Sequence, residues 1–164
     1  MSSANRLSTI VGKVNILPRA ARTPVLSLLL GRMVPYVGTT GARIEEMTEQ
    51  RVVVVVDNRR RIRNHIGQVH ATAMALAAET ATGFVSGMNV PDSKLLLCKS
   101  LRVDFKKRTQ GAIRAVATLT EDQRARMRSE DRGSVTVEVH ATDESGLEPI
   151  GCELVWAWIP RSRS

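Results

Sequence analysis

The sequence has no apolar run long enough to cross a bilayer, and its N-terminus has no apolar stretch like that of a secretory signal. Its longest apolar stretches are Val52 to Val56 and Ala73 to Ala78, whereas a membrane-spanning helix needs about 20 residues. The chain has only two cysteines, Cys98 and Cys152, and two cysteines in a reducing compartment need not form a disulfide. We therefore expect a cytoplasmic protein with two buried free thiols and no membrane partner.

Other absences narrow the classes of function. No cluster of histidine, cysteine and carboxylate residues has the spacing of a metal site. The sequence also has no zinc-finger spacing, no helix-turn-helix and no aromatic RNA-binding motif, so nucleic-acid binding would depend on charge alone. No internal repeat or linker divides the chain. We therefore expect neither a metal nor a nucleic-acid partner.

The composition indicates one folded domain with a basic surface. The chain has 164 residues, of which 43% are hydrophobic and 24% charged, enough for a hydrophobic core without disulfides or metals. The formal net charge is +8, which attracts anionic partners to the surface. Nucleic acid, an acidic membrane surface and a phosphorylated cofactor are all anionic. The positions of the basic residues must therefore decide between these partners.

The N-terminal part indicates short helices and then strands. Residues Leu17 to Met33 mix apolar and small residues, and Pro18 and Pro24 are expected to break them into one or two short helices. We expect this segment to act as a lid or brace, with Leu26 to Met33 controlling which chain lengths enter the site. Residues Ala42 to Asp57 end in five valines, which favours a strand pair or one long buried strand.

Residues Gln68 to Phe84 predict a central helix. They are rich in strong helix formers and apolar on nearly every side, so the helix should be buried. The remaining chain alternates apolar and polar residues between polar turns, which favours an antiparallel meander. We expect Arg124, Arg126 and Arg128 to lie on a loop. The strands are expected at Leu95 to Phe105, Gly111 to Thr120, Gly133 to Asp143 and Pro149 to Ile159.

A strongly curved sheet wrapped around the helix is the arrangement that buries such a helix well. We therefore predict an α+β fold, with a curved antiparallel sheet around a long central helix and a short helical N-terminal segment. The expected organisation is a single domain over residues 1–164. It comprises a helical lead or lid at 1–37, a core at 38–160 and a tail at 161–164.

The stretch from Asn64 to His70, with Glu79 in the helix that follows, resembles the hotdog-fold thioesterases. The resemblance is to the PaaI-like group and its relatives of unassigned function, which carry Asn or Gln, then Gly, then His at the helix start, and then an acidic residue in the helix. The stretch Leu101 to Gly111 is similar to the strand and turn that follow the helix, and the resemblance covers roughly residues 38–159. It implies the hotdog fold and hydrolysis of acyl-CoA, with coenzyme A as part of the substrate and no other cofactor.

The resemblance also implies roles for the residues that match the motif. Asn64 would lie near the thioester carbonyl, and the backbone N–H of Ala71, the residue after His70, would stabilise the oxyanion. Glu79 would be the catalytic carboxylate and would act either as a general base or as a nucleophile. Related proteins often have two glycines after the histidine, whereas this chain has Ala71 and Thr72, which predicts a narrower pocket. Hotdog proteins also include members without turnover, so the alternative function is non-catalytic binding of acyl-CoA or lipid.

The geometry of a helix supports part of this assignment and adds a condition. A helix N-terminus presents free N–H groups and a positive dipole, which suit a developing oxyanion. Glu79 lies nine residues beyond His70, on the opposite side of the helix and roughly 13 Å along its axis. The two residues share a site only if a symmetric partner supplies one of them. We therefore expect a dimer or a dimer of dimers.

Each functional interpretation has a structural alternative. Glu79 could lie on the wet edge of the helix, His70 could bond the backbone at the helix start, and Asn64 could stabilise a turn. Two basic groups are candidates for binding the phosphates of coenzyme A, although a solvated surface is the default for such runs. These groups are Arg61 and Arg63 before the helix, and Lys106, Lys107 and Arg108 at a strand end.

Overall fold

The structure, a computed structural model, describes residues 5–161. Three helices come first: α1 (Arg6–Val14), α2 (Arg19–Met33) and α3 (Pro35–Thr40). The helical lead therefore extends to Thr40, past the boundary that we expected at residue 37. Residues 162–164, most of the expected tail, lie outside the part that is described.

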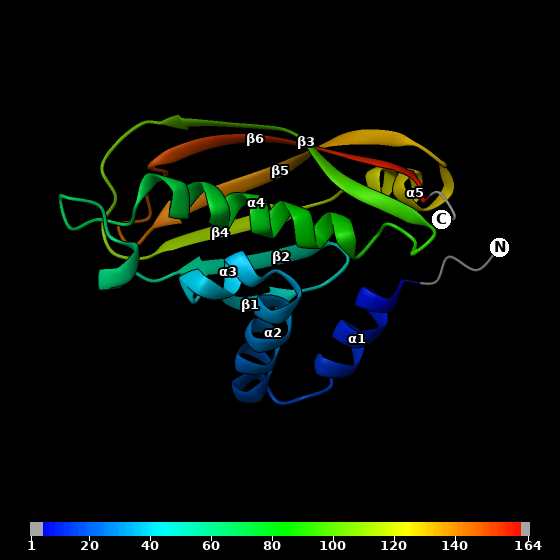
Figure 1. The fold of residues 1–164 in the computed structure, drawn as a ribbon, viewed down its shortest axis with the longest axis horizontal. Helices are drawn as coiled ribbons and strands as arrows, with labels where there is room; N and C mark the ends of the chain where they lie inside the picture. Colours follow the sequence, from blue (N-terminus) through cyan, green and yellow to red (C-terminus); the bar gives the residue numbers. More distant parts are fainter. Residues whose placement is uncertain (1–4, 162–164) are drawn as a thin grey trace.

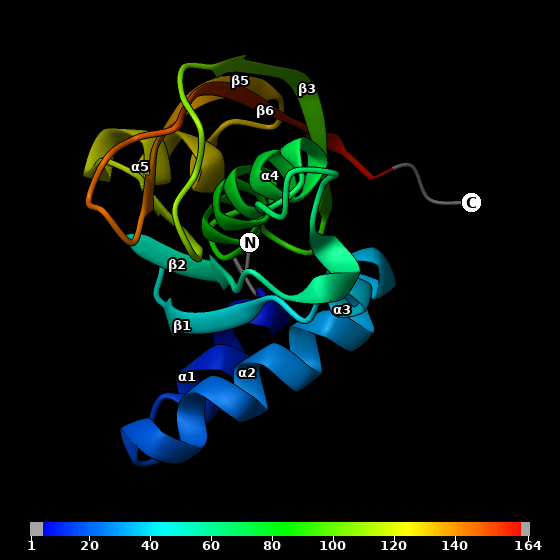
Figure 2. The same ribbon diagram turned by 90° about the vertical axis from the view of Figure 1, so that its left-hand side faces the viewer.

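One antiparallel sheet wraps around one long helix (Figures 1 and 2), as the sequence predicted. The valine-rich segment forms a strand pair rather than one long strand, and the central helix begins at Ala71. The elements are β1 (Arg43–Met47), β2 (Arg51–Val56), a 3-10 turn (Arg60–Ile62), α4 (Ala71–Gly87), β3 (Lys94–Phe105), β4 (Ile113–Thr118), α5 (Glu121–Ser129), β5 (Gly133–Asp143) and β6 (Ile150–Pro160).

The strand order in the sheet is β1-β2-β4-β5-β6-β3. The expected meander holds for β4, β5 and β6, but β3 pairs with β6 instead of β4. The reason is the connection of residues 106–112, which passes one end of α4 and carries the chain from the edge of the sheet to its middle (Figure 2). The order leaves β1 and β3 at the two edges of the sheet.

Helix α4 is held against the concave face of the sheet by small residues and one buried hydrogen bond. Ala77, Ala78 and Ala81 are fully buried, and side chains this small let helix and sheet approach closely. The indole Nε1 of Trp156 on β6 donates to the Oγ1 of Thr82 at 2.9 Å. Buried polar groups need such partners, so this bond fixes the helix relative to β6.

Helices α1 and α2 cover the β1 edge of the sheet. The backbone N–H of Ile44 donates to the Oγ of Ser27 at 2.9 Å, and the Nδ2 of Asn15 donates to the carbonyl of Met47 at 2.9 Å. Unpaired edge groups are a template for unwanted strand pairing, and these two side chains satisfy two of them.

The expected break at Pro24 is wrong, because α2 runs through this residue without interruption. Pro24 lacks the N–H that would bond the carbonyl of Ala20, but it lies on the exposed side of the helix. Leu26 and Leu30, on the other side, are almost fully buried. Their packing outweighs the loss of a single hydrogen bond.

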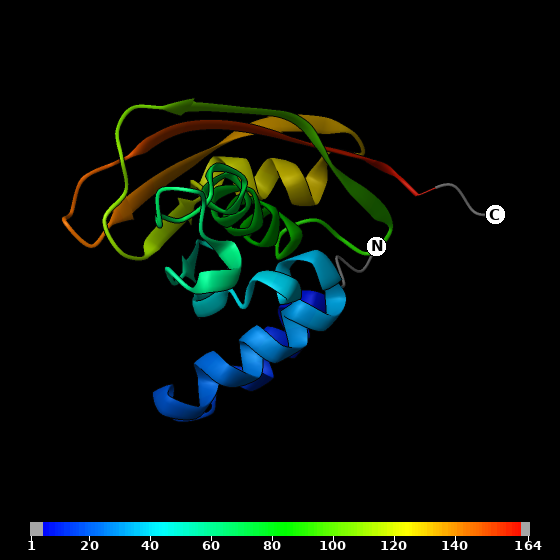
Figure 3. The same ribbon diagram turned by 60° about the vertical axis from the view of Figure 1, so that its left-hand side comes forward.

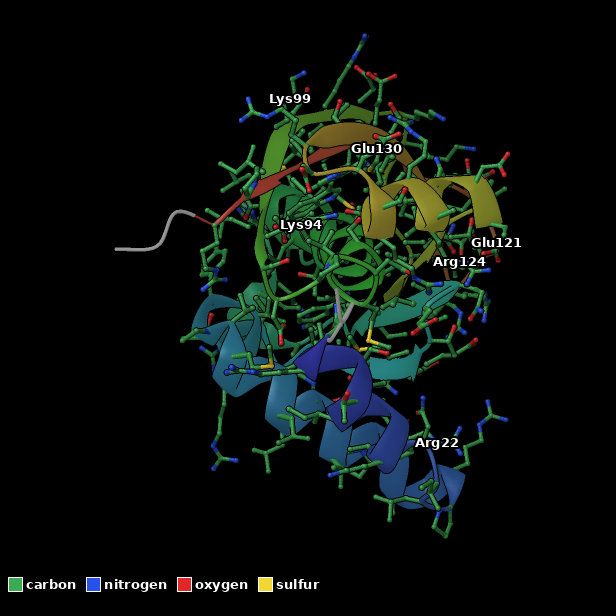
Figure 4. All side chains as sticks on the ribbon, turned by 90° about the vertical axis from the view of Figure 1, so that its right-hand side faces the viewer. Arg22, Lys94, Lys99, Glu121, Arg124 and Glu130 are labelled. Atoms are coloured by element: carbon green, nitrogen blue, oxygen red, sulfur yellow. The ribbon has the colours of Figure 1, made fainter. Side chains whose placement is uncertain are left out.

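The expectation of a loop at Arg124, Arg126 and Arg128 is also wrong, because these residues lie in helix α5. Thr120 and Gln123 form a capping box at its start, a signal that is visible in the sequence. At its other end the buried Nζ of Lys94 donates to the carbonyls of Met127, Arg128 and Glu130 at 3.0, 3.0 and 2.7 Å (Figure 4).

Strand β3 forms the open edge of the sheet and explains the exposure of one cysteine. Both cysteines are free, but Cys98 on β3 is exposed and Cys152 on β6 is only partly buried, so the expectation of two buried thiols is wrong. Cys98 is exposed because β3 has a neighbouring strand on one side only, and its pairing with β6 is interrupted by a bulge between Cys98 and Ser100.

No helix within residues 5–161 is long and apolar enough to span a membrane. No group of three or more histidine, cysteine, aspartate or glutamate residues there is arranged to hold a metal ion.

Candidate active site

Glu79 lies in the middle of α4, in a small pocket with mostly apolar walls. The pocket measures about 150 Å³ and is lined by Val34, Val37, Glu79, Thr80, Gly83, Phe84 and Trp156. Val34 and Val37 are the residues of the helical lead that line it. Control of chain length by Leu26 to Met33 stays a prediction. A side chain on Gly83 would approach the Trp156 ring to 2.9 Å, so glycine keeps this wall open.

The carboxylate of Glu79 is half-buried and has little polar support. Burial raises its pKa above the usual value, and the hydrogen bond from the Oγ1 of Thr80, at 3.4 Å, opposes this shift. The long distance indicates a weak bond. A carboxylate with a raised pKa in an apolar pocket is typical of general bases and nucleophiles.

The thiol of Cys98 on β3 lies within electrostatic range of Glu79, which no local pattern in the sequence indicates. Partial desolvation of the Cys98 side chain raises its pKa, and the negative charge of Glu79 raises that pKa further. The thiol is thus held in its protonated form. Because Cys98 lies on β3, this interaction indicates that the Glu79 carboxylate is on the side of α4 that faces the open β3 edge of the sheet.

The start of α4 has the features that the sequence predicted for an oxyanion site. The Nδ1 of His70 accepts from the backbone N–H of Thr72 at 3.2 Å, so a neutral ring carries its proton on Nε2. His70 is therefore the N-cap of α4. Its ring bonds the backbone at the helix start, which is the structural role that the sequence left open for it. The backbone N–H of Ala71 has no acceptor within the described chain and remains available to a ligand.

Asn64 stabilises a turn through its side-chain oxygen. Its Oδ1 accepts from the backbone N–H groups of Ile66 and Gln68 at 3.1 and 3.0 Å. This is the turn-forming alternative for Asn64. The Nδ2 group donates to no acceptor in residues 5–161, so the side chain keeps donors for a ligand.

Arg61 and Arg63 line the same cavity as His70. This second cavity measures about 410 Å³, and its walls come from α3, the 3-10 turn and the first turns of α4. Arg63 donates hydrogen bonds to the side chain and the carbonyl of Asn58. The guanidinium of Arg61 lies over Gly41, so a side chain at position 41 would collide with it. Neither arginine pairs with a carboxylate within the described residues. The cavity is lined by Tyr36, Thr39, Thr40, Arg61, Ile62, Arg63, His70, Thr72, Ala73 and Leu76.

Lys106, Lys107 and Arg108 line neither of these two cavities. They follow β3, in the connection that passes the same end of the molecule as the N-terminus of α4 (Figures 1 and 2). The backbone N–H groups of Lys106 and Lys107 both donate to the carbonyl of Pro149. The two basic groups therefore share one end of the molecule without sharing a cavity.

The structure thus separates the predicted residues into two sites on one helix. His70 and Ala71 lie with the arginines at the start of α4, while Glu79 lies in its own pocket further along. The sequence did not indicate the apolar residues that enclose Glu79, namely Val34, Val37 and Trp156. They come from segments far apart in the chain, and no local pattern indicates that they meet.

Solved structures with this fold include several thioesterases. A probable thioesterase from Pseudomonas aeruginosa is 20% identical, with 88% of this chain and 97% of that chain covered and a TM-score of 0.76. A thioesterase family protein from Silicibacter pomeroyi is 15% identical, with 82% and 96% covered and a TM-score of 0.64. A thioesterase from Haemophilus influenzae is 13% identical, with 76% and 82% covered and a TM-score of 0.61.

Likeness at these identities shows a common fold, which confirms the hotdog fold predicted from the sequence. No curated protein sequence matches this chain significantly. Residues 22–159 match the family described as a domain of unknown function, DUF4442. The match covers both cavities and every predicted site residue, so this chain with its hotdog fold belongs to the DUF4442 family.

Proposed function

We propose that the protein hydrolyses acyl-CoA thioesters, with Glu79 as the reactive carboxylate. The observation that carries the proposal is the position of Glu79, half-buried among apolar side chains with a raised pKa. A carboxylate in such a place costs folding energy, and groups with shifted pKa values of this kind cluster at functional sites. The thioesterases among the proteins of similar fold support the same reaction.

The reaction can follow two routes, and both need the ionised carboxylate. In the first, a water molecule gives a proton to Glu79 while its oxygen attacks the carbonyl carbon of the thioester. The C–S bond then breaks, and the leaving thiolate of coenzyme A takes up the proton. In the second, Glu79 attacks directly, expels the thiolate and forms a mixed anhydride, which water then opens.

The start of α4 supplies the group that would stabilise the oxyanion. The backbone N–H of Ala71 has no acceptor within the described residues, and the positive end of the helix dipole strengthens its attraction for a negative oxygen. The neighbouring Nε2–H of His70 and the free Nδ2–H of Asn64 are further donors at this end of the helix. The Ala71 N–H and Asn64 match the roles that the resemblance implies, and the His70 ring would add a donor beside them.

One protomer alone does not bring Glu79 and Ala71 together, so the proposed site needs two chains. Strand β3 offers the place for the second chain, because its outer edge is unpaired along 12 residues. Exposed apolar residues also lie along it, and large apolar surfaces of this kind favour association. A two-fold axis at β3 would create two equivalent sites. The apolar residues are Leu95, Leu97, Leu101 and Phe105.

The arginine-lined cavity would hold the coenzyme A part of the substrate. Arg61 and Arg63 line about 410 Å³ of space beside His70, and guanidinium groups form strong, paired hydrogen bonds with phosphates. Lys106, Lys107 and Arg108 add positive charge at the same end of the molecule. The acyl group would then extend into the apolar pocket of the second chain, which holds the carboxylate that completes the site.

The test is release of free thiol from short, medium, long and aromatic acyl-CoAs by the wild type, Glu79→Gln and Glu138→Gln. Glu138 is an exposed carboxylate on β5 and serves as the matched control. We expect turnover by the wild type and the control, and a loss of at least about 100-fold in Glu79→Gln. Equal turnover in all three proteins would remove Glu79 from the chemistry. Saturable binding of acyl-CoA without turnover would establish the binding protein instead.

A further inference from the structure

The connection between α1 and α2 carries the most exposed large apolar side chain of the described residues. Ile16 is 84% exposed, and Leu17 beside it is also exposed. The two helices extend away from the sheet, and this connection lies at their outer end (Figure 3). An isoleucine and a leucine at the end of a projection are not explained by packing within the chain.

The same projection carries positive charge and no negative charge. Glu45 is the first acidic residue of the sequence. Lys13 and Arg19, on either side of the connection, are exposed and form no ion pair within residues 5–161. We call Lys13, Ile16, Leu17 and Arg19 the hairpin tip.

The hairpin tip has a fixed shape. The Nη2 of Arg22 donates to the carbonyls of Asn15 and Leu17, at 2.8 and 3.1 Å, and Arg22 lies near the outer end of the helix pair (Figure 4). These bonds hold the connection in one conformation before any partner arrives. A preformed surface loses less conformational entropy on binding.

We propose that the hairpin tip binds the surface of an anionic lipid membrane. Ile16 and Leu17 enter the boundary between headgroups and acyl chains, about 5–10 Å deep, while Lys13 and Arg19 contact lipid phosphates. The protein then lies on the membrane without spanning it. This surface lies outside the candidate active site, and it revises the expectation from the sequence that the protein has no membrane partner.

Charge decides between a membrane and a second copy of this chain as the partner. The whole chain has a formal net charge of +8, so another copy would repel a projection that carries only positive charge. An anionic lipid surface attracts it. The open edge for a second copy is β3, whereas the α1–α2 pair covers β1 at the opposite edge of the sheet, so pairing through β3 leaves the hairpin tip free.

The test is flotation of the full-length protein with lipid vesicles. One set of vesicles contains equal parts of phosphatidylglycerol and phosphatidylcholine, and the other contains phosphatidylcholine alone. We expect the wild type to float with the anionic vesicles only, and less so as salt is added. Arg19→Ala should weaken the partition coefficient about fivefold, and Ile16→Ser about tenfold.

Two matched controls separate the hairpin tip from the general basic charge. Leu147→Ser removes an exposed leucine from the β5–β6 turn, and Arg132→Ala removes an exposed arginine near β5; both should float like the wild type. The proposal is overturned if the wild type binds neither vesicle, or if Ile16→Ser and Arg19→Ala float as well as their controls. A larger assembly in solution that Ile16→Ser dissociates would also overturn it, by assigning the tip to a second copy.

Discussion

Trp156 on β6 and Thr82 on α4 are joined by a buried hydrogen bond of 2.9 Å between the indole Nε1 and the hydroxyl Oγ1. Thr82 lies three residues after Glu79, and Trp156 also forms a wall of the Glu79 pocket. The bond therefore connects the position of the helix to the shape of the pocket. We therefore expect the burial of Glu79 to change when this contact is lost.

We predict that Thr82→Val destabilises the protein. Valine has nearly the same shape but no hydroxyl, so the buried indole N–H loses its acceptor, at a cost of about 1–3 kcal/mol. Urea unfolding followed by tryptophan fluorescence measures the change. Thr82→Ser keeps the hydroxyl and should cost less than Thr82→Val. Equal stability of the two variants would show that the bond contributes nothing.

Gly83→Ala should also destabilise the protein, although alanine is the better helix former. The added methyl group would lie 2.9 Å from the Trp156 ring, and overpacking of this kind costs about 1–3 kcal/mol of stability. The better helix propensity of alanine contributes only ~1 kcal/mol in the opposite direction. The matched control is Gly12→Ala in α1, where nothing lies within 4 Å. That variant should be stabilised, and opposite signs in thermal unfolding are the expected result. A gain of stability in both variants would contradict the tight contact at Trp156.

The stability of the protein relative to Glu79→Gln should depend on pH. Burial raises the pKa of Glu79 above 4.5 in the folded protein, so folding favours the protonated carboxyl. The folded state is penalised as pH rises, and the full penalty is reached once the pH exceeds the raised pKa. Glutamine cannot ionise. Glu79→Gln should therefore melt at a higher temperature than the wild type at neutral pH, and the difference should vanish below about pH 4.5. A difference that is the same at every pH would show an ordinary pKa for Glu79.

Lys94→Met should destabilise the end of α5. The buried Lys94 ammonium donates to three carbonyls there (Figure 4), and its loss leaves them without these charged donors, at a cost of about 1–3 kcal/mol. Lys99→Met on the same strand is the control, because Lys99 is exposed. Denaturant unfolding of both variants checks the prediction, which fails if they are equally stable.

The parts of the fold that could be predicted from the sequence are those encoded by local patterns. The alanine-rich segment predicted α4 to within three residues, and alternation predicted β5 with its correct limits. The errors have local causes too. The capping box of Thr120 and Gln123 starts a helix where the arginines alone suggest a loop. In α2, the burial of Leu26 and Leu30 outweighs the helix-breaking tendency of Pro24.

The candidate site was predictable only in part, because its walls are non-local. The motif identified Glu79, His70 and Ala71 on one helix. It could not show that Val37 and Trp156 would enclose Glu79, because this arrangement depends on how the strands and the N-terminal helices pack around α4. The placement of β3 next to β6 is set by a long crossover, which leaves no periodic signal in the sequence.

The central claim is that Glu79 of one protomer acts with the Ala71 N–H of another. Replacing Ala71 by proline removes that N–H with little other change, because the first position of a helix accepts proline. The residue before a proline must be extended, and His70 already is, with ψ 143°. Glu79→Gln and Ala71→Pro should each be inactive alone.

The decisive measurement is thiol release from acyl-CoA by the two variants unfolded and refolded together. In a mixed dimer, one shared site would carry both substitutions and the other neither, so the mixture should regain roughly a quarter of wild-type turnover. A mixture that forms mixed dimers but stays inactive would contradict the shared site, because a site within one chain would leave every copy damaged.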